Sequence, residues 1–150
     1  MILLDTSILA RFPDSASLDR PVARTALATL LRRNEQLVIV PQNLYEFWAV
    51  ATRRPGTLAS GGQNGLGLSA DRAILWIRRY QGICRTLPEI PEVLSIWKDL
   101  LATQKVTGFK AHDLRLVAAM KAHRIPRVLT FNVQHFQGFG VEVADPKTLT

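Results

Sequence analysis

The sequence ILLDTS at residues 2–7 begins with a short apolar run that ends at an acid, and it predicts the first strand of a sheet. Two similar apolar runs follow at residues 37–40 and 128–131. Apolar side chains fill nearly every position of these runs, which is typical of strands that are covered on both faces of a sheet. Because segments with helical spacing separate the runs, the sequence predicts an α/β fold with a mainly parallel sheet.

Apolar residues repeat at helical spacing in further segments of the chain. These predicted helices lie around residues 22–31, 44–51, 70–85, 91–101 and 112–123. We expect Ser69 to cap the third helix and Pro91 to open the fourth, because both residue types favour a helix start. Residues 141–143 predict an edge strand. Residues 55–68 are rich in glycine and are expected to form a long surface loop near a functional site.

The composition is that of one globular domain. The chain has 150 residues, of which 47% are hydrophobic and 21% are charged, so we expect a single domain over residues 1–150. No apolar run approaches the roughly 18 residues of a membrane span, and the N-terminal segment lacks the basic start of a signal peptide. We therefore expect a cytoplasmic protein that does not bind membranes. A single cysteine, Cys84, excludes an internal disulfide and a zinc site made of cysteines.

The net charge of the chain is +7, with 19 Lys and Arg residues against 12 Asp and Glu residues. Most of the basic residues are arginines, whose planar guanidinium group suits phosphate contacts. A basic domain of this kind has the electrostatic character of a nucleic-acid-binding protein. Composition alone is equally consistent with charge that only keeps the protein in solution. The positions of the acidic residues are therefore more informative.

Polar side chains follow two of the predicted strands. Asp5 lies at the carboxyl end of the first strand, where ligands bind in open α/β sheets. Its side chain also suits the cap of a short helix beginning near Thr6, and taken alone the cap is the stronger interpretation. Asn132 follows the third strand and offers an amide oxygen, although asparagine is also a common turn residue.

Two acids lie on predicted helices. Glu46 lies nearly opposite the apolar stripe of its helix, beside Gln42 and Arg53, so it faces either solvent or a cleft. Solvent is the favoured alternative when Glu46 is considered alone. Asp113 falls in the first turn of its helix, where the helix dipole favours an acid even without another role.

Considered together, these residues place three carboxylates and one amide oxygen near the same edge of a parallel sheet. Carboxylates repel one another unless a cation lies among them. Oxygen ligands without a cysteine or histidine cluster favour Mg²⁺ or Mn²⁺ over Zn²⁺. An acidic, metal-binding site in a basic protein indicates cleavage of phosphodiester bonds, because the positive surface attracts the polyanion while the metal activates water.

The chain also resembles the PIN-domain ribonucleases, in particular the VapC-like toxins of toxin–antitoxin pairs. The resemblance rests on residues 2–7, 41–48, 112–120 and 129–132, and it extends in order along nearly the whole chain. Residues 51–55 and 64–69 resemble one subgroup of the family. The resemblance implies a three-layer α/β/α sandwich with a mainly parallel central sheet.

The resemblance also implies roles for individual residues. Asp5, Glu46 and Asp113 match the three main acids of the family, which bind Mg²⁺ or Mn²⁺ and cleave RNA. Asn132 falls at a fourth, more variable metal-binding position. Thr6 would support the site by positioning water, and Glu46 would either bind the metal through water or deprotonate the attacking water.

Partners follow from the same resemblance and from the charge. The substrate would be RNA, and the protein would form a homodimer and bind a cognate antitoxin. The candidates for contacts with RNA phosphates that lie nearest to the acids in sequence are Arg53, Arg54 and Arg115.

The sequence departs from the family at one position. Many relatives carry an acid shortly after the last strand, whereas here His135 stands before Phe136. Imidazole suits Mg²⁺ poorly, so we expect His135 to be an exposed loop residue that binds no metal. The missing acid is consistent with an alternative, a non-catalytic RNA- or protein-binding module. A haloacid-dehalogenase-like phosphohydrolase is less consistent, because it needs a second acid where this chain has Ser7.

Overall fold

The central element of the fold is a parallel sheet of five strands. The structure, a computed structural model, describes residues 1–56 and 65–149. The strand order is β3-β2-β1-β4-β5, and each neighbouring pair is parallel. The strands are β1 (Ile2–Leu4), β2 (Leu37–Ile39), β3 (Arg85–Thr86), β4 (Arg127–Leu129) and β5 (Glu142–Ala144). The expected parallel sheet and the expected edge strand are both confirmed.

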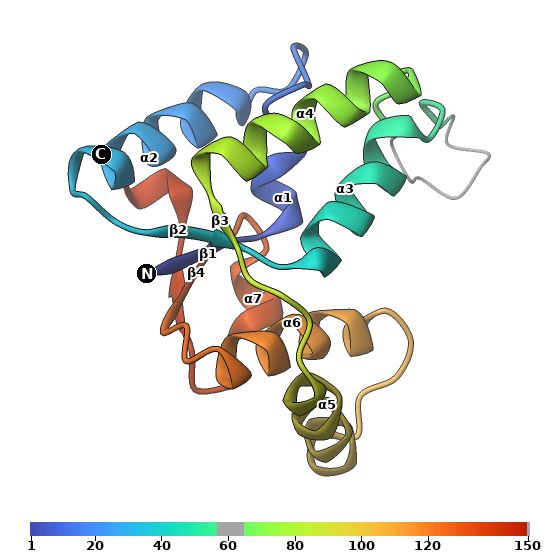
Figure 1. Ribbon diagram of the computed structural model, residues 1–150, viewed down its shortest axis with the longest axis vertical. Helices are drawn as coiled ribbons and strands as arrows, with labels where there is room; N and C mark the ends of the chain where they lie inside the picture. Colours follow the sequence, from blue (N-terminus) through green and yellow to red (C-terminus); the bar gives the residue numbers. More distant parts are fainter. Residues whose placement is uncertain (57–64, 150) are drawn as a thin grey trace.

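Helices cover both faces of the sheet, as Figure 1 shows. One face carries α1 (Thr6–Leu9), α2 (Arg20–Arg32), α3 (Pro41–Thr52) and α4 (Ala70–Ile83). The other face carries α5 (Pro91–Gln104), α6 (Lys110–Ala122) and α7 (Val133–Phe136), and the 3-10 helix η2 (Pro146–Thr148) follows β5. The three-layer α/β/α arrangement is therefore confirmed. In the described ranges, none of the helices has the length and apolar character that crossing a membrane requires.

Two buried cores explain why the strands are apolar at every position. Ile2 and Leu4 pack in the core beneath α1 to α4, whereas Leu3 points to the opposite side and packs in the core beneath α5 to α7. All three side chains are fully buried. Successive residues of a strand point to opposite faces of the sheet. Because helices cover both faces here, both sets of positions need apolar side chains.

The starts of the helices were predicted correctly more often than the shortest elements were. Ser69 caps α4 by accepting a hydrogen bond from the Arg72 backbone nitrogen at 3.3 Å, and Pro91 opens α5. Helix α6 begins at Lys110, slightly before the expected start. No pattern in the sequence predicts β3 or α7. Both elements are too short to show a periodic pattern, and the two residues of β3 are exposed.

The expected surface loop at residues 55–68 lies partly outside the described residues, which resume at Gly65. Beyond that point the chain returns to α3, because the backbone nitrogens of Leu66 and Leu68 donate hydrogen bonds to carbonyl oxygens near its end. A Cβ atom at position 65 would lie 2.0 Å from the carbonyl oxygen of Arg53, so this approach requires glycine. The close contact fixes the backbone of Arg53 at the rim of the site described next.

Candidate active site

The carboxylate of Asp5 is fixed at the carboxyl end of β1 by three donors. Its Oδ1 accepts a hydrogen bond from the backbone nitrogen of Thr6 at 2.7 Å, which confirms the expected cap of α1. Its Oδ2 accepts hydrogen bonds from Ser7 Oγ at 2.7 Å and from Thr130 Oγ1 at 2.6 Å. Thr130 follows β4, the strand beside β1, so the network ties together the ends of two neighbouring strands.

Glu46 faces a cleft and not bulk solvent. Its Oε2 accepts a hydrogen bond from Thr6 Oγ1 at 2.8 Å, and its Oε1 accepts one from Gln42 Nε2 at the same distance. The side chain therefore points across the end of β1 towards the residue that follows Asp5. Of the two alternatives that the helical pattern left open, the less favoured one is correct. The contact with Thr6 also accounts for why this threonine is buried in the site.

Gln42 is the main residue of this region that the sequence analysis missed. Its side chain is almost fully buried, and its amide nitrogen donates to both Glu46 and the carbonyl oxygen of His112. Its amide oxygen accepts a hydrogen bond from Arg115 Nη1 at 2.8 Å. The amide thus joins α3 to α6. The sequence feature that could have indicated this contact is the spacing of Gln42 and Glu46, which lie one helical turn apart on the same face.

Asp113 brings the third carboxylate to the site from the first turn of α6. Burial raises the pKa of this carboxyl above its usual value, and the negative charges of Asp5 and Glu46 act in the same direction. The neighbouring His135 and His112 oppose the shift. Asp113 and Glu46 line the same cavity, and Glu46 is linked to Asp5 through Thr6, whose side chain donates to Glu46 and whose backbone nitrogen donates to Asp5.

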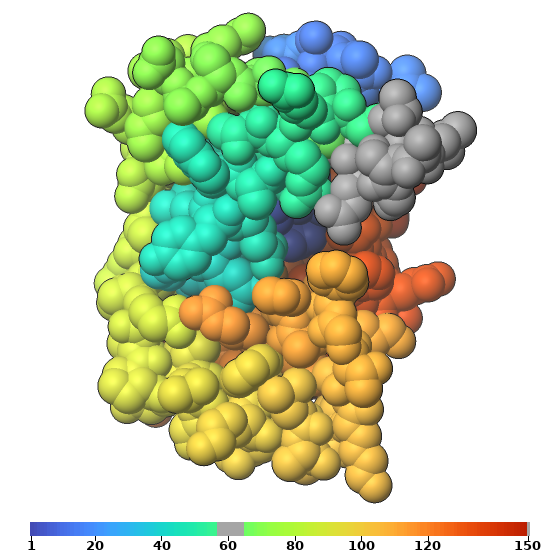
Figure 2. Space-filling model, turned by 90° about the vertical axis from the view of Figure 1, so that its right-hand side faces the viewer, coloured from blue at the N-terminus to red at the C-terminus, as the bar shows by residue number. Residues whose placement is uncertain are grey.

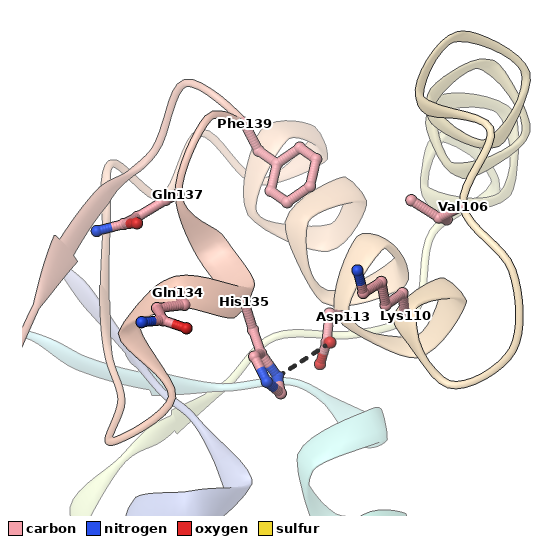
Figure 3. A pocket seen from close by; sticks show the side chains of 7 residues that line it. All are labelled: Val106, Lys110, Asp113, Gln134, His135, Gln137 and Phe139. Carbon is pink, nitrogen blue, oxygen red and sulfur yellow. Dashed lines mark ion pairs between the residues drawn. The ribbon is translucent and has the colours of Figure 1, made fainter.

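His135 contacts Asp113 directly. Its Nδ1 lies 3.2 Å from Asp113 Oδ2, and Figure 3 shows the two side chains pointing towards each other from α7 and α6. The expectation that His135 is an exposed loop residue is wrong in one respect, because the residue lies in helix α7. The side chain is nonetheless 54% exposed. The sequence gives no sign of α7, and this short helix turns His135 back towards α6.

One cavity connects the acids with Asn132. It has a volume of about 370 Å³, and its lining includes Thr6, Glu46, Asp113 and Asn132. Figure 2 shows a depression between α3 and α6 at whose base the N-terminal residues are visible. Asn132 stands before α7 and forms no side-chain cap, which leaves its amide at the cavity. The position of Asn132 beside the acids agrees with the sequence analysis.

The three candidate arginines occupy different positions. Arg53 lines the same cavity as the acids, and Arg54 is exposed beside it. Arg115 instead lines another cavity, together with Glu89. Its Nη2 lies 2.9 Å from Glu89 Oε1 while its Nη1 donates to Gln42, so its guanidinium group is engaged within the protein. The structure therefore brings Arg53 to the acids and assigns Arg115 to the support of Gln42.

The carboxylates are not gathered into a closed metal cage. Within residues 1–56 and 65–149, no group of three or more His, Cys, Asp and Glu side chains is close enough to hold a metal ion. Mg²⁺ is nevertheless commonly bound through only one or two carboxylates and keeps several of its waters. A set of hard oxygen donors beside a cavity, with one acid whose pKa is raised by burial and by two other acids, fits such a partly hydrated ion.

The comparisons with known proteins agree with this fold. The family model of the PIN domain matches residues 2–138. The chain therefore belongs to the PIN-domain family. No match is found among the sequences of curated proteins.

Solved structures of low sequence identity share the fold. VapC20 of Mycobacterium tuberculosis, described as a toxin that cleaves the sarcin–ricin loop, has 15% identity and a TM-score of 0.66, over 90% of this chain and 92% of that one. FitAcB from Neisseria gonorrhoeae has 19% identity and a TM-score of 0.66, over 99% of this chain and all of that one. VapBC2 from Rickettsia felis, bound to a DNA fragment from its promoter, has 15% identity and a TM-score of 0.66, over 96% of this chain and 98% of that one.

Proposed function

We propose that this PIN-domain protein is a divalent-metal-dependent endoribonuclease and the toxin of a type II toxin–antitoxin pair. The observation that carries the proposal is the arrangement of Asp5, Glu46 and Asp113 around one region at the carboxyl edge of the sheet. The net charge of +7 supports a polyanionic substrate. The likeness to VapC20, which is described as a toxin that cleaves the sarcin–ricin loop, supports the choice of RNA.

The residues that would hold Mg²⁺ or Mn²⁺ are Asp5, Glu46 and Asp113, with Asn132 as a weaker oxygen donor. When bound, the metal would lower the pKa of water and neutralise charge that develops on the phosphate. The protein fixes these donors in advance, because Asp5 is held by three hydrogen bonds and Glu46 by two. Such preorganisation limits the cost of reorganisation during the reaction.

Glu46 is the group best placed to accept a proton from the attacking water. Its carboxylate lines the cavity and is held by Thr6 Oγ1 and Gln42 Nε2. As water forms a bond to phosphorus, its proton passes to a Glu46 oxygen, the bond from phosphorus to the leaving ribose oxygen breaks, and that oxygen takes up a proton from solvent. Arg53 and the exposed Arg54 stand where the flanking phosphates of the RNA would pass.

The proposed biological setting includes a protein partner. A cognate antitoxin would control the nuclease, in line with the likeness to VapBC2 and to VapBC-1 from nontypeable Haemophilus influenzae. A second copy of the chain would complete a homodimer, and the pair would act in the cytoplasm. Isolation of the chain together with the product of an adjacent open reading frame would test this part of the proposal.

The nuclease activity is tested with a labelled RNA in buffer with EDTA, Mg²⁺ or Mn²⁺. We expect cleavage only with metal, and we expect Asp113→Asn to abolish it while the protein remains folded. Asp99→Asn is the matched control, because it removes the same charge at an exposed position of α5. Metal-independent cleavage would contradict the proposal. RNA binding without cleavage by the wild type would favour a non-catalytic binding module. This is the second candidate function, because Asp113 is paired with His135.

A further inference from the structure

A second cavity lies on the other side of the pair formed by His135 and Asp113. Its volume is about 360 Å³, and Figure 3 shows it between α6 and the segment that leads from α7 towards β5. Both residues of the pair line this cavity and also line the cavity that contains Glu46. The pair is therefore a wall shared by two cavities. A polymer that crosses this wall would contact both cavities.

The lining of this cavity combines three kinds of side chain. Lys110 is exposed at the start of α6, and within the described part of the chain its ammonium group forms no ion pair. Gln134 and Gln137 are exposed, and their side-chain amides have no hydrogen-bond partner among the described residues. Phe139 is half-buried, packs against the core beneath α6 and borders the cavity.

These groups match three features of a nucleotide, namely its phosphate, the edge of its base and the face of its base. An ammonium group pairs with a phosphate, an amide offers both a donor and an acceptor to the edge of a base, and an aromatic ring stacks on the face of a base. The acid in the cavity, Asp113, lies against His135 at the wall that this cavity shares with the first one. The volume is within the range of pockets that bind small molecules. An anionic ligand with a flat polar ring fits the lining better than an apolar one does.

We propose that the cavity bounded by Lys110, Gln134 and Phe139 is a subsite that binds the nucleotide next to the scissile phosphate of an RNA strand. The proposal rests on the proposed ribonuclease function and extends it, because it assigns substrate contacts to residues outside the acidic site. Phe139 stacks on the base, Lys110 contacts the phosphate and Gln134 contacts the edge of the base.

The test measures binding without cleavage. Fluorescein-labelled single-stranded RNA decamers of A, C or U are titrated with the protein in EDTA, and the dissociation constant is read from fluorescence anisotropy. We expect Phe139→Leu to weaken binding roughly tenfold, because it removes a stacking ring but keeps an apolar contact with the core. Phe139→Tyr, which retains the ring, should bind as the wild type does. Unchanged affinity of Phe139→Leu, or equal losses in both variants, would overturn the stacking role.

Lys110 is tested through salt dependence. Lys110→Met should reduce the slope of log K against log salt by about 0.7, the contribution of one phosphate contact to a single strand. Lys98→Met is the matched control, because Lys98 is an exposed lysine on α5 and does not line the cavity. If both variants change the slope equally, the effect is one of net charge and the subsite is wrong. Both lysines are exposed, so neither change is expected to unfold the protein.

Gln134 is tested by base preference. The wild type should distinguish the three decamers, and Gln134→Ala should reduce the difference. Equal binding of all three RNAs by the wild type would overturn the contact with the base. If the binding results are as expected but the protein does not cleave RNA, the proposed nuclease function is wrong and the cavity remains a nucleotide-binding site. Failure of RNA binding altogether would overturn the subsite.

Discussion

The amide nitrogen of Gln42 lies 2.8 Å from Glu46 Oε1, one turn away on α3. The same nitrogen donates to a backbone carbonyl of α6, and the amide oxygen accepts from Arg115, which is itself bound to Glu89. Every polar atom of the amide therefore has a partner. The position of Glu46 is consequently set by a network that reaches beyond the acids, and Gln42 is a positioning residue.

We expect Gln42→Glu to lower kcat for RNA cleavage at least tenfold with a smaller change in KM. The substitution keeps the shape and the acceptor for Arg115, but it replaces the donor to Glu46 by a second negative charge. Gln42→Met removes the donor without adding charge and should lower kcat less. Gln81→Glu, at an exposed position of α4, is the control. Equal kinetics in Gln42→Glu and wild type would show that Glu46 needs no support from Gln42.

The raised pKa of Asp113 predicts a dependence of stability on pH. Burial, assisted by Asp5 and Glu46, raises the pKa of Asp113 above its ordinary value of 3.8. An ionised Asp113 therefore destabilises the folded state at pH values above the raised pKa, and this cost disappears below 3.8, where both states bind the proton. In EDTA at pH 7, Asp113→Asn should melt at a higher temperature than the wild type, and the difference should vanish towards pH 3.

Thermal unfolding followed by circular dichroism at several pH values measures this effect. Asp99→Asn should show no such pattern, because its side chain is exposed on α5. A lower melting temperature for Asp113→Asn at pH 7 would mean that the contact with His135 stabilises the protein by more than burial costs. Added Mg²⁺ should stabilise the wild type more than the variant, since a ligand stabilises the state that binds it.

The elements that carry the three main acids could be predicted from the sequence because local rules determine them. Asp5 follows a strand, Asp113 begins a helix, and Glu46 lies opposite an apolar stripe, so each position depends on only a few neighbouring residues. Helical periodicity left two directions open for Glu46. Only the hydrogen bond to Thr6, which joins residues from two different elements, decides between them.

The supporting contacts could not be predicted in the same way. The hydrogen bond between Arg115 and Gln42 joins residues that are 73 positions apart, and the pairing of His135 with Asp113 depends on a helix of four residues. Neither relation leaves a periodic pattern in the sequence. Arg115 therefore resembled a candidate for phosphate binding, although its guanidinium group is held by Glu89 and Gln42.

Cys84 gives a test of the core beneath α4. Its side chain is buried, and burial raises the pKa of the thiol to about 12 from an ordinary value of 9.0. Because the thiolate is the reactive form, the native protein should react with a disulfide reagent at pH 8 roughly a thousandfold more slowly than the unfolded chain. Absorbance of the released thiolate measures both rates. Equal rates in buffer and in guanidinium chloride would show that this part of the core is open.

The last prediction concerns the charge of the metal site. Asn132 lines the cavity of Glu46 and Asp113 and contributes a neutral amide, so the proposed site has three carboxylates. Affinity for a divalent ion increases with the number of charged ligands. We expect Asn132→Asp to tighten Mn²⁺ binding roughly tenfold in isothermal titration, and Asn132→Ala to weaken RNA cleavage less than Asp5→Asn does.

The control for this charge is Asn34→Asp, at the end of α2, where the residue has a φ of 54° that aspartate also tolerates. It adds the same charge away from the cavity and should leave Mn²⁺ binding unchanged. His135→Ala removes the partner of Asp113 but no expected ligand, so it too should retain the metal. Loss of Mn²⁺ binding in His135→Ala, or equal tightening in Asn34→Asp and Asn132→Asp, would show that the acids beside Asn132 do not form the metal site.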